Sequence, residues 1–332
     1  MVLRSFSLLG CFDPCNEVVR VKDALGHWRT FYVRDKLDTG GFSRIDLIFD
    51  KTSKRSFALK RISCHSKDDE NKALKEANFQ MNLPDHPNLL PCIASGLQHV
   101  SRHEQGAISE VLLVLSYSKR GTLQREIDHR SACNTVFPPY IIKTIMIGIC
   151  EGLIALLSLD IPMSHRDIKP GNILLFEDMR PVLMDFGSVT PAILRIENNR
   201  DAEKWKEFAE ENCSLTYRAP ELFNPITQET ITERADVWSL GCLFYALIFS
   251  KSPMDFVHAR GDSVALAACS ANIPFPVNSC SNVPSELIKL LKPMLASDPQ
   301  DRPPITQILQ SFKNIPEEIM NPSDRSATTC SL

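Results

Sequence analysis

The residues with the clearest chemical meaning lie in the middle of the chain, at Asp167, Lys169 and Asn172, and Asp185 follows thirteen positions after Asn172. Phosphoryl transfer needs a carboxylate that orients the attacking hydroxyl, ligands that hold magnesium against the nucleotide phosphates, and a cation that faces the transferred group. Asp167 fits the first role and Lys169 the last, while Asn172 and Asp185 fit the metal. The order of these side chains therefore predicts a magnesium-dependent phosphoryl-transfer site.

The next requirement is a set of elements that position these groups. Lys60 ends the apolar run 57–59, and Glu76 lies in a segment, 68–83, that we predict to be helical. A carboxylate at that place can pair with the lysine ammonium and hold it for the α and β phosphates. Downstream, Ala-Pro-Glu at 219–221 closes a segment that begins at Asp185.

Together these motifs resemble the catalytic domain of eukaryotic protein kinases. Each motif alone occurs by chance, but their joint order makes the resemblance specific. It covers residues 27–316 and implies an α+β, bilobal protein kinase fold. The expected N-lobe is small and β-rich (27–118), and the expected C-lobe is larger and mainly helical (119–316). The segments 1–26 and 317–332 are expected to be tails.

The resemblance also implies roles for individual residues. Lys60 and Glu76 join Asp167, Lys169 and Asn172 in catalysis. Arg302 is expected to anchor Glu221, and Asp236 is expected to hold the backbone of the catalytic loop. ATP and Mg²⁺ are the implied cofactors, with Asn172 and Asp185 as the metal ligands. The implied ATP contacts are Leu37, Gly40, Gly41, Ile45, Ala58, Lys60, Leu115, Tyr117, Leu174 and Asp185.

Local patterns support this nucleotide site. The alternating segment 27–62, broken by two glycines at 40 and 41, predicts a strand-turn-strand unit over the phosphates. The apolar run 111–115 predicts a buried strand that leads into the adenine-binding hinge at 116–118. The phosphate loop departs from the usual glycine pattern at Asp38 and Ser43. We expect the charge of Asp38 to weaken ATP binding.

Further sequence motifs indicate which hydroxyl groups accept the phosphate and which kinase subfamily the chain resembles. A cation two residues after Asp167 is typical of serine/threonine kinases, so protein substrates with Ser or Thr acceptors are expected. The strings 40–43, 119–123, 181–185, 217–223 and 261–267 are similar to the Numb-associated kinase family, above all to its small, acylated, Golgi-associated member. This resemblance implies a link to secretory trafficking.

The segment between Asp185 and Glu221 has few hydroxyl groups. Apolar residues recur at helical spacing over 201–212, so we predict an amphipathic helix there, with Trp205 and Phe208 packed in the core. Such a segment needs no phosphate paired with Arg166, and we expect basal activity after phosphatase treatment.

The amino-acid composition limits the class of protein, its partners and its compartment. The chain has 332 residues, 43 % hydrophobic and 23 % charged, which predicts a globular protein. Its net charge of −3 argues against a nucleic-acid partner. Eleven cysteines without any Cys-x-x-Cys pair predict neither a zinc site nor a disulfide framework, and favour the cytoplasm. The apolar stretch 141–159, broken by Lys143 and Glu151, predicts a core helix.

The N-terminal tail carries Cys11 and Cys15 in apolar surroundings. Three interpretations stay open: a plain flexible tail, a cleaved signal, and acylation of both cysteines, which could hold the protein peripherally on Golgi or perinuclear membranes. N-myristoylation requires glycine after the initiator methionine, where this sequence has Val2.

Two alternative functions also remain at this point. The substituted phosphate loop is compatible with a catalytically weak or inactive pseudokinase scaffold. A small-molecule kinase is a third class, which the complete Ala-Pro-Glu motif and Ser214, at the expected peptide site, disfavour.

Overall fold

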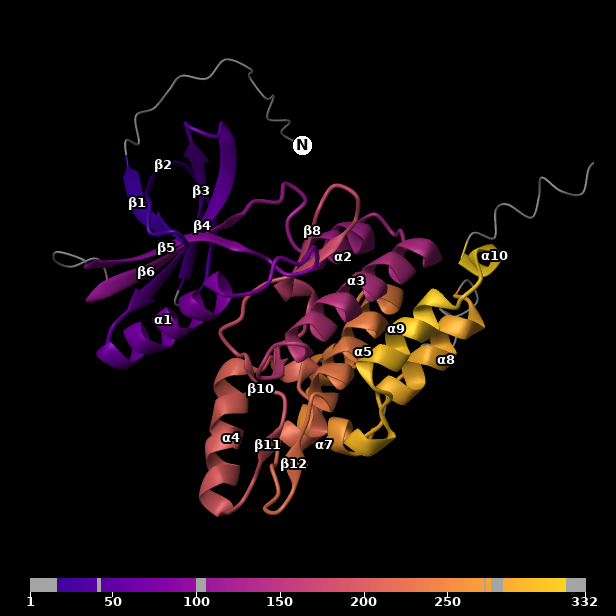
Figure 1. Cartoon of the computed structure of the whole chain (residues 1–332). Helices are drawn as coiled ribbons and strands as arrows, with labels where there is room; N and C mark the ends of the chain where they lie inside the picture. Colours follow the sequence, from indigo (N-terminus) through magenta and orange to yellow (C-terminus); the bar gives the residue numbers. More distant parts are fainter. Residues whose placement is uncertain (1–16, 41–42, 100–105, 272, 276–282, 321–332) are drawn as a thin grey trace, which may run out of the picture. The chain divides into compact units, whose positions relative to one another are not determined.

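The computed structural model describes residues 17–40, 43–99, 106–271, 273–275 and 283–320, which form two compact units (Figure 1). The first unit contains the described residues up to Asn82 together with Pro91–Tyr117, and the second contains Leu83–Leu90 and the described residues from Ser118 onward. The first is rich in strands and the second is mainly helical, which confirms the predicted α+β, bilobal kinase fold.

The first unit is a closed antiparallel barrel with the strand order β1-β2-β3-β4-β6-β5. Its strands are β1 (Val18–Asp23), β2 (Trp28–Thr39), β3 (Ser43–Asp50), β4 (Arg55–Cys64), β5 (Cys92–His99) and β6 (Ser109–Ser116). Alternate side chains point inward and form one apolar core, which contains Val19, Val21, Phe31, Ile48, Leu59, Ala94, Leu112 and Val114. The buried strand predicted at 111–115 is β6, as expected.

Strand β1 lies within the segment 1–26 that we expected to be a tail, and it extends the barrel beyond the predicted start of the domain at residue 27. The strand pairs with β2 along its length and with β5 at its end. Val19 and Val21 enter the core while the residues between and beside them face outward. The alternating pattern of β1 contains only two inward-facing valines in six residues. Because an apolar sequence precedes it, this short pattern did not stand out as a strand.

Helix α1 (Lys67–Met81) belongs to the first unit and carries Glu76. Ser66 caps its N-terminus, where its hydroxyl accepts the N–H of Asp69 at 3.1 Å and the Asp69 carboxylate accepts the N–H of Ser66 at 2.9 Å. This reciprocal pair satisfies backbone donors that a helix start leaves open. The helix predicted over 68–83 is thus confirmed.

The second unit contains the remaining helices and three two-stranded sheets among its described residues. The helices are α2 (Leu123–Ala132), α3 (Pro139–Leu157), α4 (Asn199–Asn212), α5 (Arg234–Phe249), α6 (Pro253–Ala259), α7 (Val264–Cys269), α8 (Ser285–Met294), α9 (Ile305–Lys313) and α10 (Glu317–Met320). The sheets pair β7 (Met163–Ser164) with β10 (Thr190–Pro191), β8 (Ile173–Leu175) with β9 (Pro181–Leu183), and β11 (Leu194–Arg195) with β12 (Thr230–Ile231).

Helix α3 is the apolar segment that we predicted to be a core helix. By length and composition alone it could cross a membrane, but half of its most apolar stretch is buried within the protein. A Cβ atom added at Gly148 would come within 2.6 Å of Pro181, and one at Gly152 within 2.7 Å of Leu183. Both glycines therefore allow β9, the strand that leads to Asp185, to lie directly against α3.

The end of the second unit extends beyond the expected boundary at 316. Helix α10 begins at Glu317, whose carboxylate lies 2.9 Å from the Nζ atom of Lys143. The same ammonium donates to the carbonyl of Ile315 at 2.8 Å. Lys143, the charge that interrupts the apolar pattern of α3, thus holds part of the segment that we expected to be a tail.

Helix α4 confirms the helix predicted over 201–212, but the prediction that its aromatic residues pack in the core is wrong. Ala209 is fully buried, whereas Trp205 and Phe208 are only half-buried and pack edge to face with ring centroids 5.3 Å apart. The Asn198 side chain caps the helix by accepting the N–H of Asp201 at 3.0 Å.

Candidate active site

Asp236, in the first turn of α5, binds the backbone of the catalytic loop. Its two carboxylate oxygens accept the backbone N–H groups of His165 at 2.7 Å and Arg166 at 2.8 Å. Asp236 is 3 % exposed, and Arg166 has a left-handed backbone with φ of 65°. The carboxylate thus stabilises a conformation that a non-glycine residue rarely adopts, and the structural role predicted for Asp236 is confirmed.

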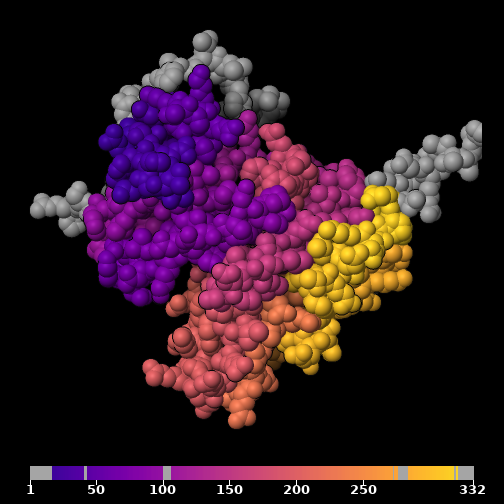
Figure 2. All heavy atoms as spheres, viewed as in Figure 1, coloured from indigo at the N-terminus to yellow at the C-terminus, as the bar shows by residue number. Residues whose placement is uncertain are grey.

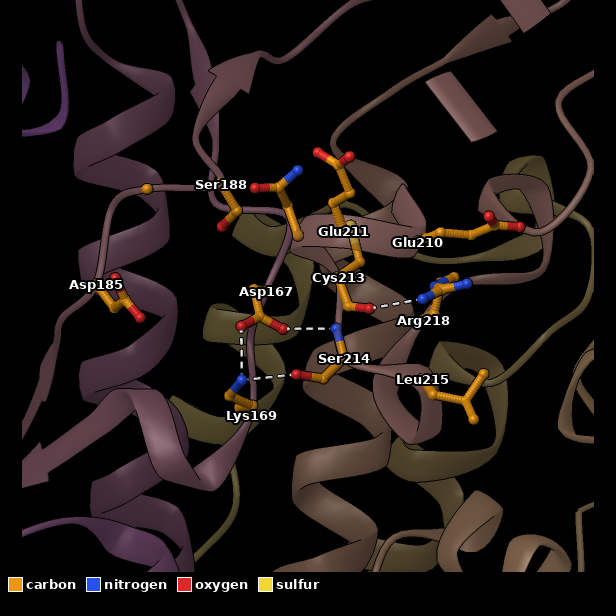
Figure 3. Close-up of a pocket in the computed structure, with 12 residues that line it drawn as sticks. Asp167, Lys169, Asp185, Ser188, Glu210, Glu211, Cys213, Ser214, Leu215 and Arg218 are labelled. Carbon is orange, nitrogen blue, oxygen red and sulfur yellow. Dashed lines mark hydrogen bonds and ion pairs between the residues drawn. The ribbon is translucent and has the colours of Figure 1, made fainter. Parts of the chain in front are cut away.

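The carboxylate of Asp167 is surrounded by donors (Figure 3). One of its oxygens accepts a hydrogen bond from the side-chain amide of Asn172 at 2.8 Å. The same oxygen lies 2.8 Å from the Nζ atom of Lys169. The other oxygen accepts the backbone N–H of Ser214 at 2.9 Å. Lys169 also donates to the Ser214 hydroxyl at 2.6 Å. The catalytic loop and the end of the activation segment therefore meet at one carboxylate.

Asn172 and Asp185 are the expected metal ligands. The amide nitrogen of Asn172 donates twice to Asp167, to its carboxylate and to its main-chain carbonyl at 2.9 Å, so the amide oxygen is the atom left to bind a cation. Asp185 has φ of 64° and lines the same cavity as Asp167. Amide and carboxylate oxygens are ligands that Mg²⁺ accepts when phosphates and water complete its shell. These residues fit the metal.

The cavity around these groups has a volume of about 490 Å³ and lies wholly within the second unit. Its lining includes Asp167, Lys169, Asp185, Ser188, Glu210, Glu211, Cys213, Ser214 and Arg218 (Figure 3). Burial raises the pKa of the Cys213 thiol to about 12, and the neighbouring Asp167 charge acts in the same direction. Cys213 is therefore a neutral thiol beside the site.

Arg166 makes several contacts within the second unit. Its guanidinium donates to the Thr190 hydroxyl at 3.0 Å and to the carbonyls of Thr232 at 2.6 Å, Pro191 at 3.1 Å and Ala192 at 3.0 Å. Burial lowers the pKa of Arg166, although Asp236 opposes the shift. The arginine thus joins the start of the activation segment to the residues just before α5.

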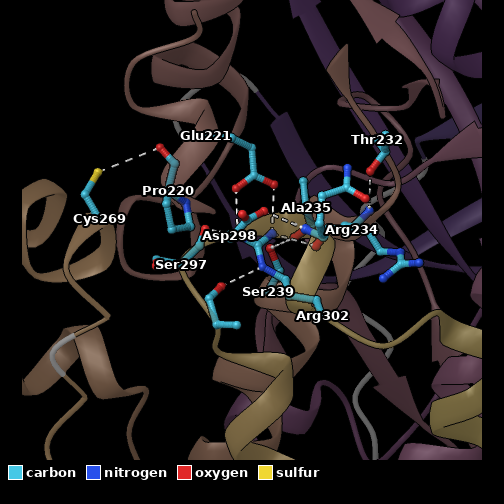
Figure 4. A network of polar contacts seen from close by, with 12 residues as sticks. Pro220, Glu221, Thr232, Arg234, Ala235, Ser239, Cys269, Ser297, Asp298 and Arg302 are labelled. Atoms are coloured by element: carbon cyan, nitrogen blue, oxygen red, sulfur yellow. Dashed lines mark hydrogen bonds and ion pairs between the residues drawn. The ribbon is translucent and has the colours of Figure 1, made fainter. Parts of the chain in front are cut away.

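The end of the activation segment is anchored by a buried ion pair (Figure 4). Arg302 donates from two nitrogens to the two carboxylate oxygens of Glu221, each at 2.8 Å. The same guanidinium donates to the carbonyls of Arg234 at 2.8 Å, Ser297 at 2.9 Å and Ala296 at 2.8 Å. The pairing predicted for Glu221 and Arg302 is confirmed.

The first unit holds the predicted Lys60–Glu76 pair, with the Nζ atom 2.8 Å from the carboxylate. Both side chains are largely buried, which strengthens the electrostatic attraction between them. Lys60 lies on β4 and Glu76 on α1, so the pair joins the barrel to its helix.

Comparisons with known proteins match this architecture. The family model described as "Protein kinase domain" matches residues 31–312. The chain belongs to the protein kinase family. It is 40 % identical over 278 residues to serine/threonine-protein kinase 16 of Rattus norvegicus and equally to that of Homo sapiens, in each case covering 84 % of this chain and 88 % of the relative. It is 28 % identical over 314 residues to serine/threonine-protein kinase ppk13 of Schizosaccharomyces pombe, covering 85 % and 89 %.

This kinase is accordingly a serine/threonine protein kinase, and ATP and Mg²⁺ are the standard cofactors of its family. The comparisons do not support the pseudokinase alternative. The comparisons do not show membership of the Numb-associated kinase family or acylation of the tail, and both remain predictions.

The structure distributes the predicted site residues of the kinase over its two units. The first contains Leu37, Gly40, Ile45, Ala58, Lys60, Glu76, Leu115 and Tyr117, and the second contains Asp167, Lys169, Asn172, Leu174 and Asp185. Gly41, Cys11 and Cys15 lie outside the described residues.

Two contributors to the site were not predicted. Thr190 binds Arg166, and the backbone of Ser214 binds Asp167, in addition to the side chain that the sequence suggested for peptide binding. Thr190 gave no signal because one hydroxyl among loop residues has no distinctive spacing. The Ser214 contact depends on a main-chain group, which every non-proline residue carries.

Proposed function

We propose that this kinase transfers the γ-phosphate of ATP to Ser or Thr hydroxyls of proteins, with Asp167 as the catalytic base. The observation that carries the proposal is the carboxylate of Asp167, held by Asn172, Lys169 and Ser214 at 2.8 to 2.9 Å. Three donors on one carboxylate fix its orientation before a substrate arrives, and such preorganisation is what phosphoryl transfer requires of a protein.

In the proposed reaction the substrate hydroxyl oxygen forms a bond to the γ-phosphorus while the bond from that phosphorus to the β,γ-bridging oxygen breaks. The hydroxyl proton passes to Asp167, and ADP leaves. Lys169, 2.8 Å from Asp167, is placed to balance the charge of the transferred group. Its bond to the Ser214 hydroxyl must be exchanged or shared when substrate binds.

Mg²⁺, when bound, neutralises the charge of the nucleotide phosphates. Asn172 and Asp185 are the residues that we propose to hold it. Lys60, fixed by Glu76, is proposed to bind the α and β phosphates. We further propose Leu37, Gly40, Gly41, Ile45, Ala58, Leu115, Tyr117 and Leu174 as the ATP contacts.

The experiment is a phosphate transfer assay on a protein substrate, with the wild type compared with Asp167→Asn and Glu76→Gln. We expect Asp167→Asn to lower kcat by at least about 100-fold, since a general base contributes on that order. Glu76→Gln removes the charge that pairs with Lys60 and should raise KM for ATP. Asp255→Asn, an exchange of the same type at the start of α6, is the control. Equal kcat for the wild type and Asp167→Asn would overturn the assigned role.

We also propose that activity does not depend on phosphorylation of the activation segment. The contacts of Arg166 with Thr190 and with the carbonyls of Pro191 and Ala192 support this, because the arginine already binds the segment that a phosphate would otherwise recruit. Phosphatase-treated enzyme should keep its kcat within about twofold. Complete loss of activity that returns on rephosphorylation would contradict the proposal.

Finally, we infer that the chain is a Numb-associated kinase that is acylated at Cys11 and Cys15, is cytoplasmic and peripheral on Golgi or perinuclear membranes, and serves secretory trafficking. The strings quoted above and the two tail cysteines support the inference. Palmitoyl exchange labelling tests it: the signal should disappear in Cys11→Ser/Cys15→Ser. A signal that persists in this variant would move the acylation to other cysteines, and no signal in the wild type would reject it.

A further inference from the structure

The outward side of the β1–β2 hairpin exposes an unusual combination of side chains. Trp28 is 68 % exposed, Leu25 is 80 % exposed and Val18 is 47 % exposed. The exposed side chains of Arg20 and Lys22 alternate with the buried valines of β1. We call these five residues the hairpin face. In Figure 2 the indigo atoms of this hairpin form part of the visible surface.

The strand register places Val18, Arg20, Lys22 and Trp28 on one side of the sheet, and Leu25 lies in the turn that joins the two strands. Lys22 lies directly opposite Trp28 on the neighbouring strand, and its Nζ atom is 5.2 Å from the centre of the indole ring. Val19 and Phe31, opposite each other, point to the other side and enter the barrel core. Since residues directly opposite share a side of the sheet, the hairpin face presents cations and apolar groups together.

Two carboxylates near the hairpin face, Asp23 and Asp50, bind other groups of the protein. Asp23 accepts the backbone N–H groups of Leu25 at 3.0 Å and His27 at 2.9 Å, within the hairpin turn itself. Asp50 is 4 % exposed and binds Arg29 at 2.6 Å. Residues 17–55 contain nine Lys and Arg against six Asp and Glu, although the whole chain has a net charge of −3. The surplus of positive charge therefore lies in the part of the sequence that contains the hairpin and β3.

We propose that the hairpin face binds an anionic phospholipid surface. An indole with an apolar neighbour suits the boundary between headgroups and acyl chains, and Lys and Arg side chains beside it can reach the phosphates. Each Lys or Arg near an anionic leaflet strengthens binding about fivefold at physiological salt. A protein partner with an acidic, apolar surface is the main competing occupant, and the test separates the two.

The position of the face along the chain agrees with this assignment. Glu17, next to Val18, is fixed to the barrel: its carboxylate pairs with Arg61, and its carbonyl accepts the N–H of Val33 at 3.0 Å. Cys15 precedes Glu17 by two residues, which is at most about 7 Å of extended chain. The proposal holds without a lipid on Cys15.

The test uses the full-length chain with Cys11→Ser/Cys15→Ser, so that no acyl group contributes. Its sedimentation with phosphatidylcholine vesicles is compared with vesicles that contain about one-third phosphatidylserine. We expect binding only to the anionic vesicles, weakened by high salt because exposed charges are screened. Adding Arg20→Ala/Lys22→Ala should lower the partition coefficient about 25-fold, at about fivefold per residue. Trp28→Ser should lower it independently.

The matched control is Lys72→Ala/Lys75→Ala, which removes two exposed charges from α1 in the same unit. An equal loss in this control would overturn the proposal, because binding would then follow net charge. Quenching by brominated lipids gives a second measurement: it should fall in Trp28→Phe, which keeps an aromatic ring and is expected to fold. Absence of binding by the starting chain, or quenching unchanged in Trp28→Phe, would also overturn it.

Discussion

Replacing Asp236 by Asn tests how the active site of this kinase is built. The Asp236 carboxylate accepts the backbone N–H groups of His165 and Arg166, which precede Asp167, and we assign Asp236 no role in binding ATP or Mg²⁺. An amide has the same shape but only one acceptor oxygen, so one buried N–H group faces an NH₂ group instead. We expect lower stability and a misplaced catalytic base.

The magnitude follows from the two contacts. A hydrogen bond to a charged acceptor contributes about 1.5 to 3 kcal/mol, and a buried donor left unsatisfied costs about 1 to 3 kcal/mol. Both N–H groups are in buried residues. The sum of one weakened and one lost bond is about 2 to 4 kcal/mol. Arg166, with its φ of 65°, can then relax toward an ordinary conformation. A displacement of Asp167 by 1 Å lowers kcat about 100-fold.

The assay combines urea unfolding with steady-state kinetics. Asp236→Asn should unfold at a lower urea concentration and lose kcat, with KM for ATP changed little. The control is again Asp255→Asn, whose carboxylate accepts the N–H of Ser252 at 2.8 Å. It should lose about 1 kcal/mol at its helix cap and keep its kcat. The reasoning is refuted if Asp236→Asn retains the wild-type urea midpoint and a kcat within about twofold of the wild type.

Three further predictions concern other parts of the chain. Asp38→Gly should lower KM for ATP up to about fivefold, since an exposed charge contributes about 0.2 to 1 kcal/mol; an unchanged KM in an ATP titration would count against it. Arg302→Leu should cost about 3 to 5 kcal/mol in urea unfolding because it leaves the Glu221 carboxylate unpaired, and a loss below about 1 kcal/mol would be inconsistent with a buried pair. Burial raises the pKa of Cys92 and Cys213 to about 12, from an ordinary value of 9.0. Between pH 9.0 and about 12 the thiols of the unfolded chain ionise and those of the folded chain do not. The free energy of unfolding should therefore fall by up to about 1.4 kcal/mol per pH unit for each thiol, and Cys92→Ala and Cys213→Ala should each show a shallower fall above pH 9.

The sequence predicts best where a role requires particular side chains in a fixed order. Asp167, Lys169 and Asn172 meet at one carboxylate as expected, and Glu221 finds Arg302 although eighty-one positions separate them. Phosphoryl transfer restricts which residues can stand at these places, so the pattern carries the geometry. Amphipathic spacing likewise predicted α4 in a segment that lacks ordinary loop composition.

The sequence did not predict how deeply a side chain is buried, or which contacts the main chain makes. Trp205 and Phe208 lie on the expected side of α4, but periodicity specifies a direction and not how far a side chain is covered. Strand β1 was missed because its partner residues in β2 and β5 decide whether a short alternating segment joins a sheet. The N–H of Ser214 could not be inferred from its residue type.

Helix α5 explains why the catalytic loop and the activation segment form a single site. Asp236 binds the catalytic loop, and the Ser239 hydroxyl donates to the carbonyl of Tyr217 at 2.8 Å. The carbonyl of Arg234 accepts a hydrogen bond from Arg302 (Figure 4). Three residues in its first two turns therefore hold the loop that carries the base, the ion pair that ends the activation segment, and the backbone between them. Because these contacts share one rigid helix, a change at any of them should alter the position of Asp167 relative to Ser214.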